Sequence, residues 1–378
     1  MFSFRNGQLL QAEEIIAEME ARKMPPCKPM TLRFQFSNPA FSPVDPLAGT
    51  QITEKGTWAK VTKNVGDRNI WDWTCTDCDW SNAFFGLFGD PDNLVDIIDA
   101  GDTSGVNTVA GMFSNRAESN NDPSPYNYLR SCCLFDTSNV TNTHEMFAGA
   151  KIIERVPDFN TSKVERASGM FYHCTQLIAA PNLDLSHAVD LGAMFKSCIS
   201  LKYVPKYNLS SARYLKKMFN GCYAIEYIPD MDTPNVTDLY LAFGSCYALK
   251  RIPRINTAKV TDMTGTMNAC PALAELPVFD YSSATVIKLL AGANSADKTS
   301  PSIDRIPNLD TMTDKLEDCD SAFRNLRHVK YGILEAYNVL LACNPSTHKY
   351  CFTNCGIDTD EGRAQLEQIP ASWGGLAS

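Results

Sequence analysis

Residues 208–231 read NLSSARYLKKMFNGCYAIEYIPDM, and this segment is one unit of an internal repeat. The pattern returns with a constant 24-residue period, and three columns of identical residue types share it. The columns are Cys174, Cys198, Cys222, Cys246 and Cys270; Pro157, Pro181, Pro205, Pro229, Pro253 and Pro277; and Phe147, Phe171, Phe195, Phe219 and Phe243, which Met267 continues. A fixed period of about 20–29 residues is typical of a solenoid.

Apolar residues fill further columns at spacings of three within each unit. They are Leu201, Ile225, Leu249 and Leu273; Val204, Ile228, Ile252 and Leu276; and Tyr207, Met231, Ile255 and Phe279. We expect these columns to point inward. One coil cannot bury its apolar side alone, so successive coils must stack around a shared core.

Each unit predicts one short helix and one short strand. The segment before Met-Phe, such as VTDLYLAF at 236–243, has helical spacing and begins after a capping Thr, Ser or Asp. The segment ending in Ile-Pro predicts a very short strand, with proline at its end because proline lacks a backbone donor. The expected fold class is therefore α/β: a leucine-rich-repeat solenoid of 24-residue coils with caps at both ends.

Three regions follow from this pattern. We expect an N-terminal helix and cap or attachment region over 1–73, the solenoid of nine or ten coils over 74–330, and a C-terminal cap over 331–378. The first region predicts strands at MTLRFQF and TWAKV, and the last predicts helices at YGILEAYNVLLAC and TDEGRAQLEQI. Insertions around NNDPSPYNYL and AGANSADKTSPS lengthen two units.

Residues 7–23 predict an amphipathic helix with Leu9, Ala12, Ile16 and Met19 on one face. This helix is too short to be stable alone, so its apolar face must be buried. Two interpretations stay open: the helix packs as part of the N-terminal cap, or it attaches the protein to a partner or to copies of itself.

Composition narrows the function classes. The 378 residues carry 34 Lys and Arg against 43 Asp and Glu, a net charge of −9, which disfavours binding nucleic acid over the whole surface. No run of about 18 apolar residues exists, so membrane insertion is not expected. The start lacks the basic and apolar segments of a secretory signal, which leads us to expect maturation in a cytosol or prior removal of a signal.

Catalytic, metal and cofactor motifs are not recognisable, and we expect a non-enzymatic protein without a cofactor. The five histidines fall in different units. The cysteine column predicts reduced, buried side chains, since equivalent positions of stacked coils all point inward. Four possible zinc ligands lie close together in the chain: Cys343, His348, Cys351 and Cys355. Their spacing fits no familiar zinc motif, so zinc binding by this group stays open.

The interval 196–260 is locally basic, with ten Lys and Arg against four acids. Two outward columns flank the predicted strand and place tyrosines beside cations. The candidate ligand-binding residues are Arg155, Lys202, Tyr203, Tyr227, Lys250 and Arg251. Tyrosine adds contact area at small entropic cost, so this face suits a polysaccharide or a protein. An ordinary solvated face is the alternative.

The repeat resembles the BspA-type leucine-rich repeat of bacterial surface proteins. The similarity is carried by DTSNVTNTHEMF at 136–147, PNVTDLYLAFGSCYALKRIP at 234–253 and AKVTDM at 258–263. NIWDWT at 69–74 and QIPASWG at 368–374 resemble the flanks of such proteins in gut bacteria and their tailed phages. The resemblance implies an adhesin and brings no enzymatic residue with it.

Together these features lead us to expect a phage virion component made in the host cytoplasm. It would be a fibre, decoration or adhesin protein that displays its repeats for attachment to a host surface glycan or protein. The expected partners also include other virion proteins or further copies of the chain. The alternative is a bacterial cell-surface adhesin of the BspA-like type.

Overall fold

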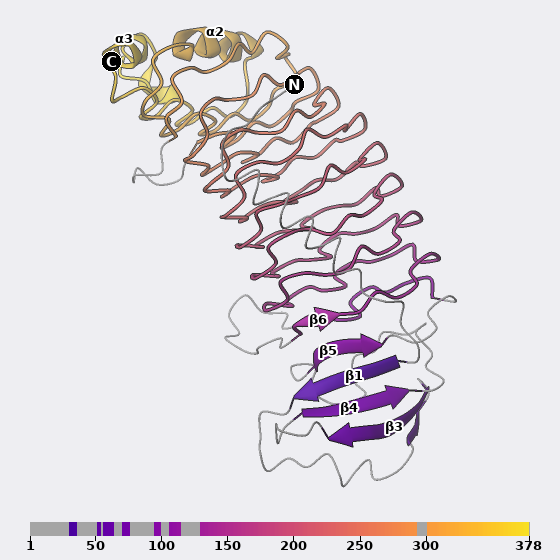
Figure 1. The fold of residues 1–378 in the computed structure, drawn as a ribbon. Coiled ribbons are helices and arrows are strands. Elements are labelled where there is room, and N and C mark those ends of the chain that lie inside the picture. Colours follow the sequence, from indigo (N-terminus) through magenta and orange to yellow (C-terminus); the bar gives the residue numbers. More distant parts are fainter. Residues whose placement is uncertain are drawn as a thin grey trace, which may run out of the picture.

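The computed structural model describes residues 30–35, 51–53, 56–63, 70–75, 94–99, 106–114, 129–292 and 301–377. Stacked coils form an elongated, curved array between a six-stranded sheet at one end and the helices α2 and α3 at the other (Figure 1). The predicted helix over 7–23, with Leu9, Ala12, Ile16 and Met19, lies outside the described residues.

The coils are joined by a continuous ladder of parallel bridges through one position of each. The ladder runs Thr108, Asn142, Arg166, Asp190, Tyr214, Asp238, Asp262, Val286, Asp318 and Thr347. Six consecutive steps of the ladder, from 142 to 286, keep the constant period that the repeat predicts. Equivalent residues therefore stack in register along the array, which is the arrangement the sequence predicts. Its assignment to the leucine-rich-repeat class stays a prediction.

The structure differs from the prediction of a short helix in each coil, because the described residues from 106 to 292 contain turns, isolated bridges and β6 but no helix. The backbone amides explain the difference. The amides of Glu145, Phe147 and Gly149 donate to carbonyls of the following coil, whereas the intervening amides of Met146 and Ala148 donate within their own coil. An α-helix would need every one of these donors for itself. The predicted helix is therefore wrong.

Left-handed backbone at two positions of each coil is a second feature that excludes an α-helix, which needs a negative φ at every residue. The first position has positive φ at Glu145, Gly169, Ala193, Lys217, Leu241, Gly265 and Leu289, and the second at Gly149, His173, Ser197, Gly221, Ser245 and Ala269. Left-handed backbone is costly for most side chains. The inter-coil hydrogen bonds and the packing that each turn makes possible must offset that cost.

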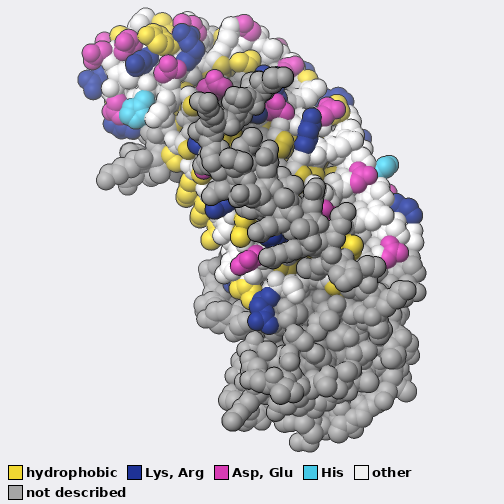
Figure 2. Space-filling model, in the orientation of Figure 1, with side chains coloured by type: hydrophobic (Ala, Val, Ile, Leu, Met, Phe, Trp, Pro, Cys, Tyr) yellow, Lys and Arg dark blue, Asp and Glu magenta, His cyan; other side chains and the backbone are white. Residues whose placement is uncertain are grey.

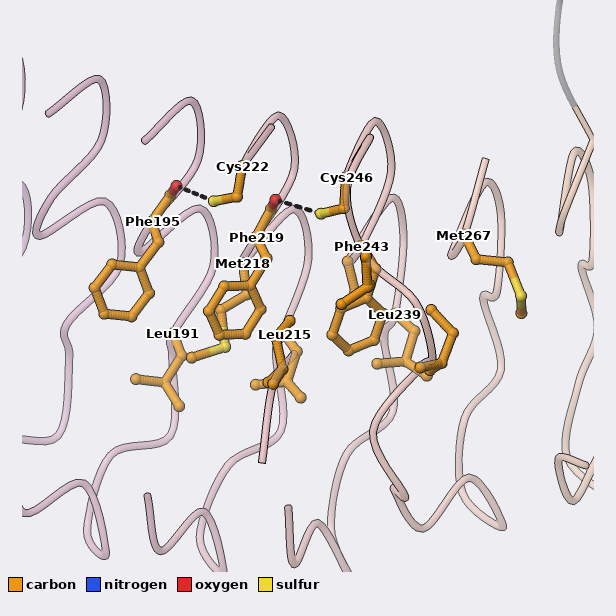
Figure 3. Close-up of a cluster of buried hydrophobic side chains, with 14 of the residues drawn as sticks. Leu191, Phe195, Leu215, Met218, Phe219, Cys222, Leu239, Phe243, Cys246 and Met267 are labelled. Carbon is orange, nitrogen blue, oxygen red and sulfur yellow. Dashed lines mark hydrogen bonds between the residues drawn. The ribbon is translucent and has the colours of Figure 1, made fainter. Parts of the chain in front are cut away.

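Stacked phenylalanines form the centre of the core (Figure 3). Phe147, Phe171, Phe195, Phe219 and Phe243 are all at most 1% exposed. Successive ring centroids lie 5.4–6.0 Å apart, and their planes differ by 4–10°. Burial of one such side chain contributes roughly 1.5–3 kcal/mol, so this column is a major source of stability.

The N-terminal sheet has the strand order β2-β3-β4-β1-β5-β6. Its strands are β1 (Met30–Gln35), β2 (Gln51–Thr53), β3 (Gly56–Lys63), β4 (Ile70–Cys75), β5 (Leu94–Asp99) and β6 (Ser131–Cys132). The predicted strands at MTLRFQF and TWAKV correspond to β1 and β3. The predicted boundary between residues 73 and 74 falls within β4.

All neighbouring strands of this sheet are antiparallel except β5 and β6, which are parallel. Ser131 of β6 lies one repeat period before Arg155, so β6 occupies the strand position of a coil. Asp96 and Ile97 of β5 pair with Ser131 and Cys132. The sheet thus passes directly into the coil stack and covers its first end.

The C-terminal end contains one coil more than the sequence predicts. Amides of Cys319, Ser321, Phe323 and Asn325 donate to carbonyls at 347, 349, 351 and 353, which is the alternating pattern of the regular coils. Phe352 stacks on Phe323 with ring centroids 5.7 Å apart. The stack therefore continues past 330 to about residue 356.

Helices and an aromatic side chain close this last coil. The predicted helices are confirmed as α2 (Ile333–Cys343) and α3 (Asp360–Leu366), and a 3₁₀ turn, η2 (Ala371–Trp373), follows. The carbonyl of Trp373 accepts the amide hydrogen of Phe352, and its ring stacks on His348 at 4.1 Å. Trp373 is 5% exposed, so it covers the end of the core.

Candidate functional site

The residues two and three positions before each repeat proline, such as Lys202 and Tyr203 before Pro205, form an outward face that we call the strand face. Ile178 donates its amide hydrogen to Glu154, Lys202 to Ile178, and Lys250 to Glu226. Ala179 and Tyr203 form a parallel bridge in the neighbouring column. The stack therefore brings all six candidate ligand-binding residues into two adjacent columns: Arg155, Lys202, Tyr203, Tyr227, Lys250 and Arg251.

Within the strand face, two of the candidate cations are paired with carboxylates. Lys250 Nζ lies 2.6 Å from Glu226 Oε2 and 5.2 Å from the ring centre of Tyr227. Arg251 Nη1 lies 2.8 Å from Asp230 Oδ1. Tyr227 is 53% exposed beside these pairs, Tyr203 and Arg155 are half-buried, and Lys202 is exposed. The face is thus less basic than its cation count suggests.

Charge elsewhere on the described surface is mixed. Figure 2 shows acidic and basic side chains interspersed at the C-terminal end of the molecule. Arg327 forms a two-pronged pair with Asp358 there, at 2.7 Å for each hydrogen bond. That pair lowers the pKa of Asp358 by hydrogen bonding and raises the pKa of Arg327. Such pairs tie neighbouring coils together and leave no broad field of one sign there.

A second group of cations lies away from the strand face, on the turns that contain the buried phenylalanine of each coil, such as residues 192–197 and 240–245. We call these turns the turn segment. We call Lys196, Lys216 and Lys217 the lysine trio. Lys196 Nζ lies 4.8 Å from the ring centre of Tyr172, and Lys216 and Lys217 lie 4.9 and 5.3 Å from that of Tyr240. Sequence reasoning counted these lysines but did not group them, because they occupy three different positions of the repeat.

The lysine trio is crowded with positive charge. The pKa of Lys217 is lowered by partial burial and by the charges of Lys196 and Lys216. The pKa of His173, whose ring lies beside Tyr172, is lowered by burial and then by Lys196 and Lys151. Lys216 and Lys217 lie over the same Tyr240 ring, so their ammonium groups are close together, and Lys196 in the preceding coil adds to the positive charge.

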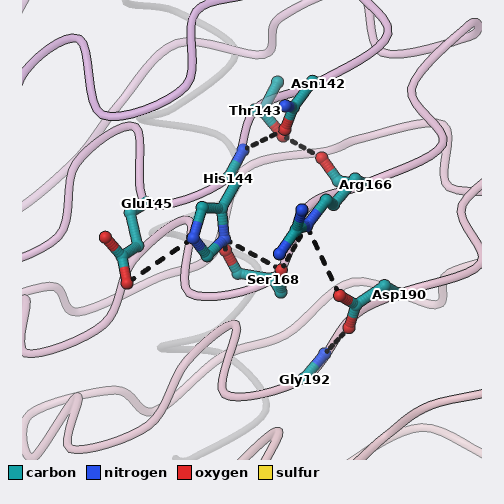
Figure 4. Close-up of polar contacts among 8 residues, drawn as sticks. All are labelled: Asn142, Thr143, His144, Glu145, Arg166, Ser168, Asp190 and Gly192. Atoms are coloured by element: carbon teal, nitrogen blue, oxygen red, sulfur yellow. Dashed lines mark hydrogen bonds and ion pairs between the residues drawn. The ribbon is translucent and has the colours of Figure 1, made fainter.

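The repeat period also places a serine, a histidine and a carboxylate side by side (Figure 4). His144 Nδ1 lies 2.9 Å from Ser168 Oγ, and His144 Nε2 lies 3.7 Å from Glu145 Oε1. These three residue types form nucleophilic triads in hydrolases. No sequence motif indicated this group, because His144 and Ser168 lie in different coils.

The hydrogen bonds of this group favour a structural role. His144 Nδ1 lies 2.8 Å from the carbonyl oxygen of Ser168, and a carbonyl can only accept a hydrogen bond. Nδ1 therefore carries a proton and cannot take one from Ser168, as a general base must. Arg166 donates to Ser168 Oγ at 3.3 Å and faces Asp190 at 3.6 Å. The group links three coils through polar contacts.

The four C-terminal residues considered for zinc do not converge in the structure. Cys351 and Cys355 are fully buried in the last coil, Cys343 ends α2, and His348 stacks on Trp373. Among the described residues, no group of three or more His, Cys, Asp or Glu side chains is placed to hold a metal ion.

The cysteine column has a hydrogen-bonding role that the sequence did not predict. The thiols of Cys174, Cys198, Cys222, Cys246 and Cys270 donate to phenylalanine carbonyls of the preceding coil, at 3.0–3.1 Å. All five are at most 1% exposed and none is bonded to another cysteine, which confirms the predicted burial, while their reduced state stays a prediction. Burial raises the pKa of Cys270 to about 12.

No helix in the described part of the chain is long and apolar enough to cross a membrane.

Comparison with known proteins identifies one family. The family model described as "Mycoplasma protein of unknown function, DUF285" matches residues 62–179, 179–281 and 213–328. Repeated matching of one model along one chain is the result expected of internal repeats, and the matches together cover the coil stack up to residue 328. No curated protein and no solved structure matches the chain.

Proposed function

The chain belongs to the DUF285 family of repeat proteins, and from that premise we propose that it is a non-catalytic recognition protein. In this proposal the strand face binds a glycan or a protein on the surface of a host cell. The coil stack acts as the scaffold that holds the face rigid.

The observation that carries the proposal is the register of the coils. Backbone hydrogen bonds join the strand face of one coil to that of another, such as Lys202 to Ile178 at 2.8 Å and Lys250 to Glu226 at 3.0 Å. Tyr203 pairs with Ala179, and Tyr227 directly follows Glu226, so the stack supports both tyrosines. Rigid aromatic side chains lose little entropy on binding, and tyrosine is enriched among the residues that dominate binding energy.

The paired charges of the strand face can orient a bound ligand but attract a charged ligand only weakly. Lys250 and Arg251 are balanced by Glu226 and Asp230, so a ligand meets hydrogen-bonding groups of both signs beside the Tyr227 ring. Polar groups around an exposed aromatic centre are typical of recognition surfaces. This pattern supports a glycan or protein ligand over a densely charged polymer.

We further propose that the protein is displayed on a phage particle. The segments at 69–74 and 368–374 support this placement through their resemblance to proteins of gut bacteria and their phages. Display on a bacterial cell surface is the second candidate, and the bacterial origin named in the family description favours it. Mass spectrometry of purified virions separates the two, since absence from the particle would contradict the first.

Binding of the labelled protein to a panel of bacterial cells and their purified surface polysaccharides and proteins tests the proposed strand face. Tyr227→Ala is expected to weaken binding about tenfold, equivalent to about 1.4 kcal/mol. Tyr214→Ala is the matched control. The exposed fraction of Tyr214, 45%, is similar to that of Tyr227, but Tyr214 lies in the bridge ladder and not on the strand face. Equal effects of the two substitutions would refute the assignment of the face.

A further inference from the structure

The lysine trio combines geometry and charge in a way that the strand face does not. Tyr172 lies in the first of four consecutive coils, Lys196 in the second, Lys216 and Lys217 in the third, and Tyr240 in the fourth. With coils spaced about 4.8 Å apart, the group spans about 14 Å along the stack. Two tyrosine rings thus stand at its ends and three ammonium groups lie between them.

Within the described part of the chain, the lysine trio has no ion-pair partner. Among the residues that the structure describes, no carboxylate lies within 4.0 Å of Lys196, Lys216 or Lys217. The cations of the strand face differ, since Lys250 and Arg251 each have a carboxylate at 2.8 Å or less. An anionic ligand at the lysine trio would relieve the repulsion among the three lysines.

Two carboxylates, those of Asp238 and Glu145, lie near the lysine trio and its tyrosines but form no ion pair with the lysines. Asp238 lies near Lys216, whose charge partly offsets the raised pKa that burial gives Asp238. Asp238 Oδ1 already accepts the amide hydrogen of Tyr240 at 2.8 Å. Glu145 lies near Tyr172 and adds to the effect of burial in raising the pKa of that phenol. Neither acid is placed to replace a bound anion.

The chemistry of the cluster favours an acidic carbohydrate over a nucleic acid. Three cations in a chain of net charge −9 cannot balance a duplex, which carries one charge per about 1.7 Å. An acidic polysaccharide carries its charges on sugars that also offer hydroxyl groups. The hydroxyls of Tyr172 and Tyr240 can hydrogen-bond to such groups. The amide of Asn220, in the same column as Lys196, already donates to the carbonyl of Gly244 at 3.0 Å, which leaves its Oδ1 as an acceptor.

We propose that Lys196, Lys216 and Lys217, held between the rings of Tyr172 and Tyr240, bind the oxyanion groups of an acidic polysaccharide. The groups are carboxylates of uronic acids or sulfate esters, which share three features: negative charge, acceptor oxygens and attachment to a sugar ring. This site lies on the turn segment of the coils. It goes beyond the proposed strand face and is tested separately from it.

Affinity measurements with three defined polymers test the site. Polygalacturonate supplies carboxylates, dextran sulfate supplies sulfate esters, and neutral dextran has neither. We expect the full-length protein to bind at least one charged polymer, and not neutral dextran. The substitution of all three lysines, K196Q/K216Q/K217Q, is expected to weaken that binding roughly 30-fold at low salt, equivalent to about 2 kcal/mol. Added salt should narrow this difference, because salt screens exposed charges.

The matched control is K163Q/K206Q/K259Q. It removes the same charge from three exposed lysines outside both the strand face and the lysine trio. We expect it to weaken binding less than about threefold, and thermal melting checks that both triple variants remain folded. The carboxylate and sulfate polymers identify which oxyanion the site prefers.

Three results would overturn the proposal: equal weakening by the two triple variants, no binding of either charged polymer, or equally tight, lysine-dependent binding of duplex DNA. None of these results concerns Tyr227, so the strand-face proposal could survive them. Conversely, a loss of cell binding in Tyr227→Ala with unchanged polymer binding would support two separate sites.

Discussion

Single residues tie the coils together through bonds that cross from one coil to the next. Cys222 shows this most clearly, because its thiol donates to the carbonyl oxygen of Phe195 at 3.1 Å and its side chain is fully buried. The sequence predicted a small buried residue at this position from its period alone. It could not predict the thiol donor, because the acceptor is a backbone atom whose position depends on the left-handed turns.

Alkaline pH should weaken the fold through these thiols. The pKa of Cys270 rises from an ordinary 9.0 to about 12 on folding, so the unfolded chain loses its thiol proton first. The thiol's contribution is fully present below pH 9 and is lost as pH rises from 9 to 12. Between those values the free energy of unfolding should fall by up to about 1.4 kcal/mol per pH unit for this group.

Urea unfolding at a series of pH values measures this effect. Cys270→Ala is the control, since it removes the titrating group and should give a shallower decline above pH 9. Wild type and variant with parallel curves from pH 8 to 12 would contradict buried, protonated Cys270.

At the scale of the element, the turn segment is where the sequence misled. The polar and apolar spacing of VTDLYLAF is helical, yet Leu241 within it has a φ of 52°. The spacing of apolar residues predicts which side chains face inward, and in this segment Val236, Leu239 and Phe243 are indeed buried. It says nothing about whether amides bond within their own coil or to the next one, and that choice separates a helix from these turns.

Glycine substitution distinguishes the two backbones. Ala193 has a φ of 55°, so Ala193→Gly should leave stability unchanged or raise it by up to about 1 kcal/mol. Ala224, equally half-buried and without positive φ, is the control, and Ala224→Gly should cost about 0.5–1 kcal/mol. Thermal denaturation measures both. A loss in Ala193→Gly as large as that in Ala224→Gly would indicate a helical segment.

The last coil shows a second limit of reasoning from the period. The step from Phe323 to Phe352 is longer than the regular period, so residues 347–356 fall outside the repeat columns. Cys355 follows Leu326 by the same longer step, and Leu326 occupies the cysteine position of its own coil. Zinc binding by the cysteines near His348 therefore stayed open in the sequence, whereas the structure places Cys351 and Cys355 in the core.

For the whole molecule, stability should spread from coil to coil through the stacked core. Phe219→Ala removes a fully buried ring that stacks on Phe195 and Phe243, and the expected cost is roughly 3–5 kcal/mol. Because coils contact only their neighbours, hydrogen exchange should speed up first in coils beside residue 219. Tyr214→Ala, at a 45% exposed position, should leave exchange unchanged. Faster exchange confined to the ends of the stack would contradict this.

The two candidate surfaces also differ in how far the sequence predicted them. The strand face follows directly from the period, since its columns flank a recognisable Ile-Pro. Lys196, Lys216 and Lys217 occupy different columns, and only the folded turns bring them together. Contacts between different positions of neighbouring coils require the geometry of the turns, and the sequence pattern does not contain it.

Residues one repeat period apart should be neighbours in adjacent coils, and an engineered cross-link tests this register directly. Glu226→Cys/Lys250→Cys places thiols one coil apart, about 4.8 Å between backbones, which suits a disulfide. Lys202→Cys/Lys250→Cys spans two coils, about 9.6 Å, which is too far. We predict that mild oxidation and peptide mass spectrometry will show the first cross-link and not the second; the reverse, or equal yields of both, would contradict the stacked register on which both proposed surfaces depend.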